Sequence, residues 1–364
     1  MDMAKIDPNF RVESDIREPG LVWLPASAPV FSLHGVLPPS AEENYYRRLP
    51  TSVAEEVSPG TVSLHAHCAG GRIRFVTDSP YIAIQAKMRD IGRMPHFAMT
   101  GSSGFDLYAD DGMHGDVYEC TFVPPFGMTD GYESLLFFRT RGKKTVTVNF
   151  PLYSEVVSLS VGLHGDALLE RAEAYRYSVP VVYYGSSITQ GGCASRPGNS
   201  YQGILTRMLG CDHINLGFSG NAKGEQAMAR YIAGLDMSVF VMDYDHNAPN
   251  PEHLRATHAP FFRTVREAHP DLPVVMINRP KLVLNEEEIA RRQVVVDTYE
   301  AARAAGDENV YFVDGSSFFA DYAGDSATVD GSHPNDLGFM AMARGLEPLL
   351  RRLLEERAQP IRLS

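Results

Sequence analysis

The sequence has no cluster of positive charge and no long apolar run, and each deficit excludes a class of partner. Its 364 residues include 33 Lys and Arg against 45 Asp and Glu, which gives a formal net charge of -12 at pH 7. Contact with nucleic-acid phosphates requires clustered Lys and Arg, so an acidic chain without a basic arm excludes nucleic acid as its partner. No window approaches the roughly 18 consecutive apolar residues of a membrane-spanning helix, so we expect no membrane partner.

Cysteine is also scarce. The four cysteines, Cys68, Cys120, Cys193 and Cys211, are few for this length and show no tight pairing pattern. The first ten residues, MDMAKIDPNF, have neither the positive start nor the apolar stretch of a secretory signal. These features predict a cytoplasmic protein with reduced thiols. The length is sufficient for two domains with substantial cores.

The first half of the chain is rich in strand-like segments. Polar and apolar residues alternate with the period of two expected of half-buried strands at residues 72–77, 81–86, 134–139, 145–150 and 156–161. Turn-forming sequences such as Asp78-Ser79-Pro80 separate them. Many short strands at hairpin spacing predict a β-sandwich or jelly roll.

In the second half, strands alternate with helices. Strands are predicted near residues 181–184, 213–218, 239–242, 273–277 and 309–313, and helices near 201–209, 225–233, 251–267, 286–305 and 337–354. This alternation predicts a five-stranded parallel sheet covered by helices on both faces, a three-layer α/β/α domain. We therefore expect an α/β protein with a β-sandwich domain at residues 1–175 and an α/β/α domain at residues 176–364.

Four short segments of the second half contain the residues suited to chemistry. They are GSSIT at 185–189, NLGFSGN at 215–221, DYDHN at 243–247 and DGSHP at 330–334. Three follow a predicted strand and one precedes the last helix, so all four are expected at the carboxyl edge of the sheet, where such folds bind ligands. Together they contain the groups needed for acyl transfer through a serine.

Ser187, Asp330 and His333 are the candidate catalytic residues. Ser187 follows a strand and a glycine, at the start of a helical turn whose dipole favours negative charge. With a spacing of three, the Asp330 carboxylate can accept from one nitrogen of the His333 ring and leave the other free to take a proton from a serine. Taken singly, Ser187 and Asp330 are better explained as turn or helix caps, and only their combination favours catalysis.

Gly220 and Asn247 are the candidate donors to an oxyanion. Glycine lets the backbone approach a ligand closely, and Asn247 offers a side-chain amide. An ordinary strand-to-helix turn and an Asx turn are the alternative explanations.

In this order, the four segments resemble the conserved blocks of the SGNH, or GDSL-like, esterase and lipase superfamily. Residues 185–189 are similar to its G-D-S-[LI]-T block, 215–221 to its glycine block, 243–247 to its asparagine block and 330–333 to its terminal D-x-x-H. The resemblance covers about half of the chain, residues 178–356.

The resemblance implies a mechanism. His333 would deprotonate Ser187 while Asp330 supports the imidazolium. The Ser187 N–H, the Gly220 N–H and the Asn247 side chain would form the oxyanion hole. No metal and no cofactor would be needed.

Two positions depart from the family pattern. Ser186 stands where an aspartate usually precedes the nucleophile; that aspartate is not a triad member, so only local hydrogen bonding is affected. The block usually written G-x-N-D reads DYDHN here. Asn247 is the better match to the family asparagine, and Asp245 is the alternative, although a carboxylate donates a hydrogen bond only when it is protonated.

An all-β domain ahead of such a catalytic domain is similar to certain carbohydrate esterases and related acyltransferases. That similarity implies removal of a short acyl group, in particular acetyl, from a sugar or another small-molecule ester. Arg196, His246 and Asp245 are the candidates for contact with such a substrate, Arg196 through a polar or anionic group. A solvated Arg196 and a structural hydrogen bond of His246 are the alternatives.

Three functions remain open: an ester hydrolase, an acyltransferase that uses the same serine, and a non-catalytic ligand-binding protein. Metal sites are disfavoured. The segment Asp243-x-Asp245-x-Asn247 lacks the glycine and the distal glutamate of a calcium loop, and His65 and His67 have no second ligand cluster at zinc-site spacing. The oligomeric state is not indicated by the sequence.

Overall fold

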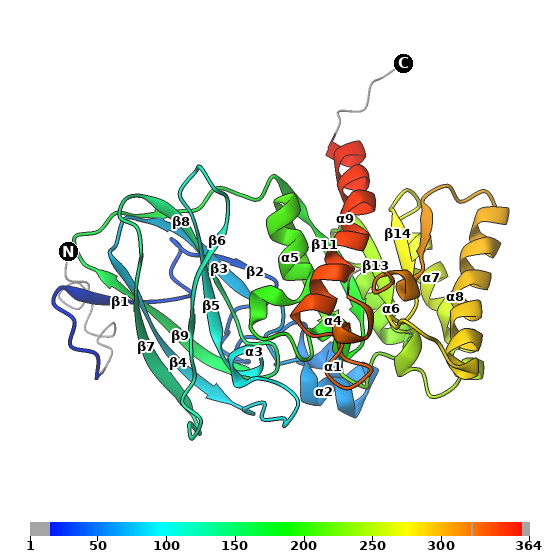
Figure 1. Cartoon of the computed structure of the whole chain (residues 1–364), viewed down its shortest axis with the longest axis horizontal. Helices are drawn as coiled ribbons and strands as arrows, with labels where there is room; N and C mark the ends of the chain where they lie inside the picture. The colour runs from blue at the N-terminus through cyan, green and yellow to red at the C-terminus, as the bar shows by residue number, and fades with distance from the viewer. Residues whose placement is uncertain (1–14, 322, 359–364) are drawn as a thin grey trace, which may run out of the picture. The chain divides into compact units, whose positions relative to one another are not determined.

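The chain forms two compact units in the computed structural model, which describes residues 15–321 and 323–358 (Figure 1). Unit 1 comprises the described residues up to 48 together with 66–174 and 195–198, and unit 2 comprises 49–65, 175–194 and the residues from 199 onward. The change at 174 lies beside the predicted boundary. Residues 49–65 and 195–198, however, belong to the opposite unit from the one that a single boundary at 175 assigns to them.

Unit 1 contains two antiparallel sheets. The first has the order β1-β9-β4-β7, with β1 (Leu21–Pro25), β4 (Tyr81–Arg89), β7 (Gly131–Phe137) and β9 (Glu155–His164). The second has the order β10-β3-β8-β5-β6, with β3 (Arg72–Thr77), β5 (Phe105–Asp110), β6 (Val117–Phe122), β8 (Lys144–Asn149) and β10 (Leu169–Arg171). Strand β2 (Ser32–His34) also pairs with β3, and α3 (Met99–Ser102) is a single turn.

The two sheets of unit 1 enclose one hydrophobic core. Alternate residues of each strand point inward, such as Ile82 and Ile84 of β4 and Ile73 and Phe75 of β3. All four side chains are fully buried. The five predicted strands are present with shifts of a few residues at their ends, and the arrangement is a sandwich; a jelly-roll connectivity stays a prediction.

Unit 2 contains a five-stranded parallel sheet of order β12-β11-β13-β14-β15. Its strands are β11 (Tyr177–Gly185), β12 (Cys211–Gly217), β13 (Val239–Asp243), β14 (Val274–Ile277) and β15 (Val310–Val313). Its longer helices are α5 (Tyr201–Leu209), α6 (Gln226–Ala233), α7 (Pro251–Ala268), α8 (Glu286–Ala304) and α9 (Asp336–Ala358). The predicted α/β class and five-stranded parallel sheet are confirmed.

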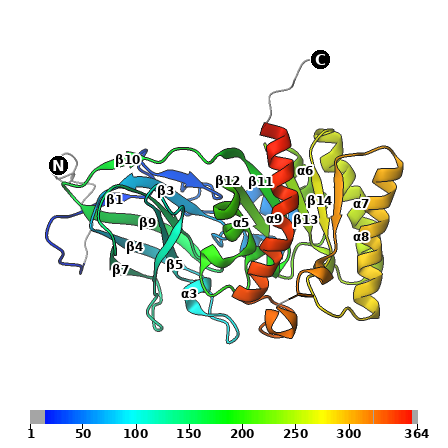
Figure 2. The same cartoon turned by 45° about the horizontal axis from the view of Figure 1, so that its top comes forward.

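Successive residues of a strand point to opposite faces of the sheet, and the helices of unit 2 form one layer on each face (Figure 2). Tyr184 of β11 lies in a core shared with α6, α7 and α8, where its ring stacks on that of Phe261 at 4.8 Å. The neighbouring Tyr183 points to the opposite face, where its ring meets Tyr201 of α5 at 5.5 Å, and Tyr201 in turn stacks on Phe339 of α9. The sheet is therefore covered on both faces, as a parallel sheet requires.

The sequence analysis missed two short helices, α1 (Thr51–Val57) and α2 (Pro59–Leu64), inside the half expected to be all-β. Leu49 and Ala54 are fully buried in the core of unit 2, which explains why this segment belongs to that unit. At seven and six residues, these helices are too short to show a clear helical period. Among the described residues, no helix combines the length and the apolar character needed to cross a membrane.

Candidate active site

The register of the parallel sheet brings three of the four segments together. Gly185, at the end of β11, pairs with Gly217 of β12 on one side and with Asp243 of β13 on the other. The residues that follow these strands therefore leave the sheet at one edge. Gly185 has no room for a side chain, because a Cβ would lie 2.0 Å from the Thr189 hydroxyl and 2.2 Å from the Asp243 carbonyl oxygen.

Ser187 is the first residue of the one-turn helix α4 (Ser187–Gln190). The buried Ser186 caps this turn, since its hydroxyl accepts a hydrogen bond from the Ile188 N–H at 3.1 Å. The cap holds the turn in place and leaves the next hydroxyl, that of Ser187, available for other contacts.

A continuous hydrogen-bond chain joins Ser187 to His333 and Asp330. The distance from Ser187 Oγ to His333 Nε2 is 2.9 Å, and from His333 Nδ1 to Asp330 Oδ2 it is 2.8 Å. With a carboxylate on Nδ1, that nitrogen is the one suited to carry the ring proton, so Nε2 faces the serine as an acceptor. The arrangement suits proton transfer from Ser187 to His333.

The turn before His333 keeps Asp330 ionised. Partial burial opposes the charge of Asp330, but three hydrogen bonds outweigh it and lower its pKa to about 2. They come from the backbone amides of His333 and Ser332, at 2.8 and 3.0 Å from Oδ1, and from the His333 ring. Asp330 is therefore a carboxylate at neutral pH, ready to stabilise a cationic imidazole.

Gly220 and Asn247 lie on the loops that follow β12 and β13. Gly220 has φ +68° with open space where a Cβ would stand, so its backbone conformation, rather than crowding, favours glycine. Its N–H has no hydrogen-bond partner within the described part of the chain. Asn247 Nδ2 donates to the Phe218 carbonyl at 3.0 Å, which uses one of its two N–H groups.

His246 and Asp245 form a second imidazole–carboxylate pair on the loop after β13. His246 Nδ1 lies 3.1 Å from Asp245 Oδ1, and the other oxygen of Asp245 accepts from the Arg279 N–H at 3.1 Å. Asp245 is 1% exposed, and both of its carboxylate oxygens are bound by other groups of the chain. The His246 Nε2 atom is buried without a hydrogen-bond partner in the described chain.

Asp243 completes a group of three potential metal ligands with Asp245 and His246, whose ligand atoms lie within 4.8 Å of one another. Asp243, however, is a poor ligand. Burial, together with the nearby charge of Asp245, raises its pKa well above the usual range, which disfavours the ionised form that would bind a metal. Its Oδ2 accepts hydrogen bonds from the hydroxyls of Thr189 at 3.0 Å and Tyr201 at 3.3 Å.

Arg196 belongs to unit 1, where several groups surround its guanidinium. It lies over the ring of Tyr118 at 4.0 Å, donates to the Tyr108 hydroxyl at 3.4 Å and faces the buried Asp106 carboxylate at 3.7 Å. Asp106 also accepts from the Gly198 N–H at 2.8 Å. These contacts favour a structural role for Arg196 over the predicted contact with substrate.

The sequence analysis missed Arg279, which lies two residues beyond β14 and contacts both Asp245 and Ser332. It also missed the hydrogen bonds that connect Asp106 to residues 196–198. The rule that the carboxyl ends of strands hold functional groups would have pointed to Arg279, because it applies to β14 as much as to β11. Neither residue alternation nor a strand end marks Asp106, and its partner Gly198 lies 92 residues away in the sequence.

Two family profiles match the sequence. Residues 178–351 match the GDSL-like lipase/acylhydrolase family, and residues 21–169 match a domain described as the N-terminus of SGNH-hydrolase-type esterases and named for the motif GxDLY. The motif corresponds to Gly104-Phe105-Asp106-Leu107-Tyr108. No curated protein has a significantly similar sequence.

Solved structures share the fold across most of the chain. A protein from Bacteroides ovatus described as a GDSL-like lipase is 29% identical, with a TM-score of 0.82 over 92% of this chain and 98% of its own. A salicylyl-acyltransferase from a tetracycline biosynthetic pathway is 21% identical, with a TM-score of 0.76 over 95% and 100%. An acetyl xylan esterase from the rumen bacterium Butyrivibrio proteoclasticus is 14% identical, with a TM-score of 0.57 over 92% and 99%. The last two likenesses concern the fold alone.

Proposed function

Because the chain belongs to the GDSL-like lipase/acylhydrolase family of SGNH-type enzymes, we propose that it is a serine ester hydrolase with Ser187 as its nucleophile. The observation that carries the proposal is the hydrogen-bond chain from Ser187 through His333 to Asp330. Nucleophile, base and orienting carboxylate are each within hydrogen-bond reach of the next, which is the geometric requirement for an activated serine.

In the first step, Ser187 Oγ attacks the ester carbonyl carbon while His333 Nε2 takes the serine proton. The Asp330 carboxylate stabilises the imidazolium that forms. The tetrahedral intermediate then expels the alcohol, which receives the proton from His333, and the acyl group remains on Ser187.

The negative charge of the intermediate is stabilised by three N–H donors: the backbone amides of Ser187 and Gly220 and the second N–H of Asn247 Nδ2. The positive φ of Gly220 and its unpartnered N–H support this assignment. In the second step, His333 deprotonates a water molecule that attacks the acyl carbonyl, and the acid leaves with Ser187 restored.

We propose a short acyl group, acetyl in particular, on a sugar or another small alcohol as the substrate. The shared fold with an acetyl xylan esterase supports this substrate class. The buried His246 ring, with its unpartnered Nε2, is the proposed contact for a hydroxyl of the alcohol, and Asp245 fixes the orientation of that ring.

A series of chromogenic esters of increasing acyl length tests the activity, followed by acetylated sugars. We expect hydrolysis to be fastest with the shortest acyl groups. Ser187→Ala should lower kcat by a factor of about 10⁴ or more. The matched control is Ser63→Ala, which removes an exposed serine hydroxyl on α2. Unchanged turnover in Ser187→Ala would refute the proposal.

The second candidate function is acyl transfer to an alcohol other than water. The fold similarity to a salicylyl-acyltransferase, at a TM-score of 0.76, supports acyl transfer as an alternative. Product analysis with an acceptor alcohol present separates the two functions. A hydrolase yields mainly free acid, whereas a transferase yields mainly the new ester, and both lose activity in Ser187→Ala.

A further inference from the structure

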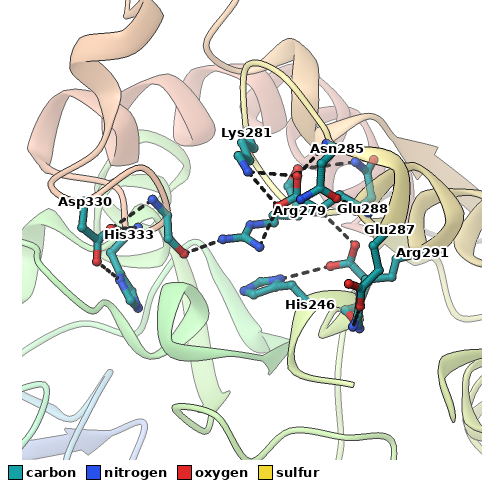
Figure 3. Close-up of polar contacts among 12 residues, drawn as sticks. His246, Arg279, Lys281, Asn285, Glu287, Glu288, Arg291, Asp330 and His333 are labelled. Atoms are coloured by element: carbon teal, nitrogen blue, oxygen red, sulfur yellow. Dashed lines mark hydrogen bonds and ion pairs between the residues drawn. The ribbon is translucent and has the colours of Figure 1, made fainter. Parts of the chain in front are cut away.

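Arg279 contacts two of the loops that bear the proposed catalytic groups, the loop of Asn247 and the loop of Asp330 and His333. Its backbone N–H donates to Asp245 Oδ2 at 3.1 Å, on the loop that continues to Asn247. Its side-chain Nη2 donates to Ser332 Oγ at 2.6 Å, between Asp330 and His333. Figure 3 shows the side chain extending from the end of its own strand toward the loop of Asp330 and His333.

The sheet register explains why one residue can make both contacts. Met242 of β13 pairs with Met276 of β14, so Asp245 and Arg279, each three residues further on, leave the sheet side by side. The backbone contact to Asp245 follows from this placement. The long side chain then covers the remaining distance to Ser332.

The other side of the Arg279 guanidinium is held by Glu288 in the first turn of α8. Arg279 Nη1 lies 2.9 Å from Glu288 Oε1, and Lys281 Nζ lies 2.8 Å from the same oxygen. Glu288 is itself fixed by a capping box, in which its carboxylate accepts from the Asn285 N–H and its N–H donates to Asn285 Oδ1, both at 2.9 Å. Burial opposes the charge of Glu288, but these partners outweigh it and lower its pKa. Glu288 is therefore ionised and forms an ion pair with Arg279.

One turn later on α8, Arg291 holds the loop after β13. This buried residue donates to the carbonyls of Asp245, at 3.0 Å, and Ala248, which flank His246 and Asn247. The beginning of α8 thus anchors the asparagine loop through Arg291 and the Asp330–His333 loop through Glu288 and Arg279.

We propose that Arg279 is a positioning residue that sets the Asp330–His333 loop relative to the loop of Asn247. This inference rests on the proposed serine esterase function. Arginine suits the role because its planar fork binds Ser332 and Glu288 at once, which the single ammonium of lysine cannot do in the same geometry. A displacement of about 1 Å between reacting groups can cost on the order of a hundredfold in rate, so the anchor affects turnover rather than binding.

Ser332→Ala is the sharpest test, because it removes only the hydroxyl that Arg279 contacts and keeps the backbone N–H that binds Asp330. We expect kcat to fall by about tenfold while KM stays within about twofold of wild type. Ser332→Thr, which retains a hydroxyl, should restore most of kcat. Because both changes break the same contact, the double variant Ser332→Ala/Arg279→Met should be no slower than Arg279→Met alone.

The matched control is Arg352→Met on α9, which removes an arginine paired with Glu356 at the exposed surface. It should match wild type in kcat. Thermal unfolding and the rate at which a fluorophosphonate labels Ser187 complete the comparison: Ser332→Ala should unfold as wild type does but react more slowly.

Each outcome has one meaning. Wild-type kcat and labelling rate in folded Ser332→Ala would overturn the positioning role. A raised KM with unchanged kcat in Arg279→Met would also overturn it, since Arg279 would then be a substrate-binding residue. If Arg279→Met does not fold, Ser332→Ala and its threonine counterpart decide. Retained activity in Ser187→Ala would refute the esterase function itself, independently of Arg279.

Discussion

At the scale of the residue, the side-chain amide of Asn247 has two tasks. One N–H holds the Phe218 carbonyl, which fixes the side chain, and the other is the proposed donor to the oxyanion. We expect Asn247→Ala to lower kcat by about 10²- to 10³-fold, because one preorganised donor contributes about 3 kcal/mol to the transition state. Steady-state kinetics on a short chromogenic ester measures the loss. A kcat within twofold of wild type would show that Asn247 is not a donor to the oxyanion.

Asp243 presents the opposite case, a buried carboxyl group whose pKa is raised in the folded protein. Its pKa is raised above that of the unfolded chain, so stability falls as pH rises from about 4 toward the folded-state pKa. Asp243→Asn removes this dependence and should make the protein more stable at pH 7, by a margin that shrinks as pH falls toward 4. Urea unfolding at several pH values measures the difference. Lower stability of the variant at pH 7, with no change in the margin toward pH 4, would contradict a raised pKa of Asp243.

The sequence was most informative where chemistry required a particular residue type. Serine, histidine and aspartate in the right order led to Ser187, His333 and Asp330, which the structure brings into hydrogen-bond contact. The sequence was least informative for residues whose role is to hold other residues in place. Arg279 and Ser332 have no distinctive spacing, and only the pairing of β13 with β14 reveals their relation to Asp245.

At the scale of the element, Asp106 of β5 holds residues 195–198 in unit 1. This fully buried carboxylate accepts from the Asn149 amide at 2.7 Å and the Gly198 N–H at 2.8 Å, and faces Arg196. Asp106→Ala would leave these donors unsatisfied, so we expect it to lower the free energy of unfolding by roughly 3 kcal/mol. Asp111→Ala, at an exposed turn, is the control. Equal unfolding midpoints for the two variants would contradict this role.

Elements whose apolar residues recur with a clear period could be predicted from the sequence. Elements that are stabilised by tertiary contacts could not. The five strands and the long helices of unit 2 follow from apolar strands alternating with amphipathic helices. The edge strands β2 and β10 are three residues long, too short to show alternation. Helices α1 and α2 are held by the core of unit 2, which is a tertiary effect that local pattern does not contain.

At the scale of the whole molecule, the stability of unit 2 depends on pH through two buried groups, His258 and Asp243, whose effects on the free energy of unfolding run in opposite directions. His258 of α7 is fully buried, and its Nδ1 lies 2.9 Å from the Thr298 hydroxyl of α8. Burial lowers its pKa to about 4, against the opposing charge of Asp245. The unfolded chain therefore binds a proton more readily than the folded protein between pH 6.5 and 4, so His258 reduces stability as pH falls through that range, whereas Asp243 increases it.

His258→Gln isolates this contribution, because glutamine can still bond Thr298 but does not titrate. Between pH 7 and pH 5, we expect wild type to lose roughly 2 kcal/mol more unfolding free energy than the variant. The variant is expected to be less stable at pH 7, since it also loses the stacking of His258 on Tyr244. The difference between the two pH slopes, measured by urea unfolding, is therefore the decisive quantity. Parallel slopes would mean that His258 takes up its proton in the folded protein as readily as in the unfolded chain.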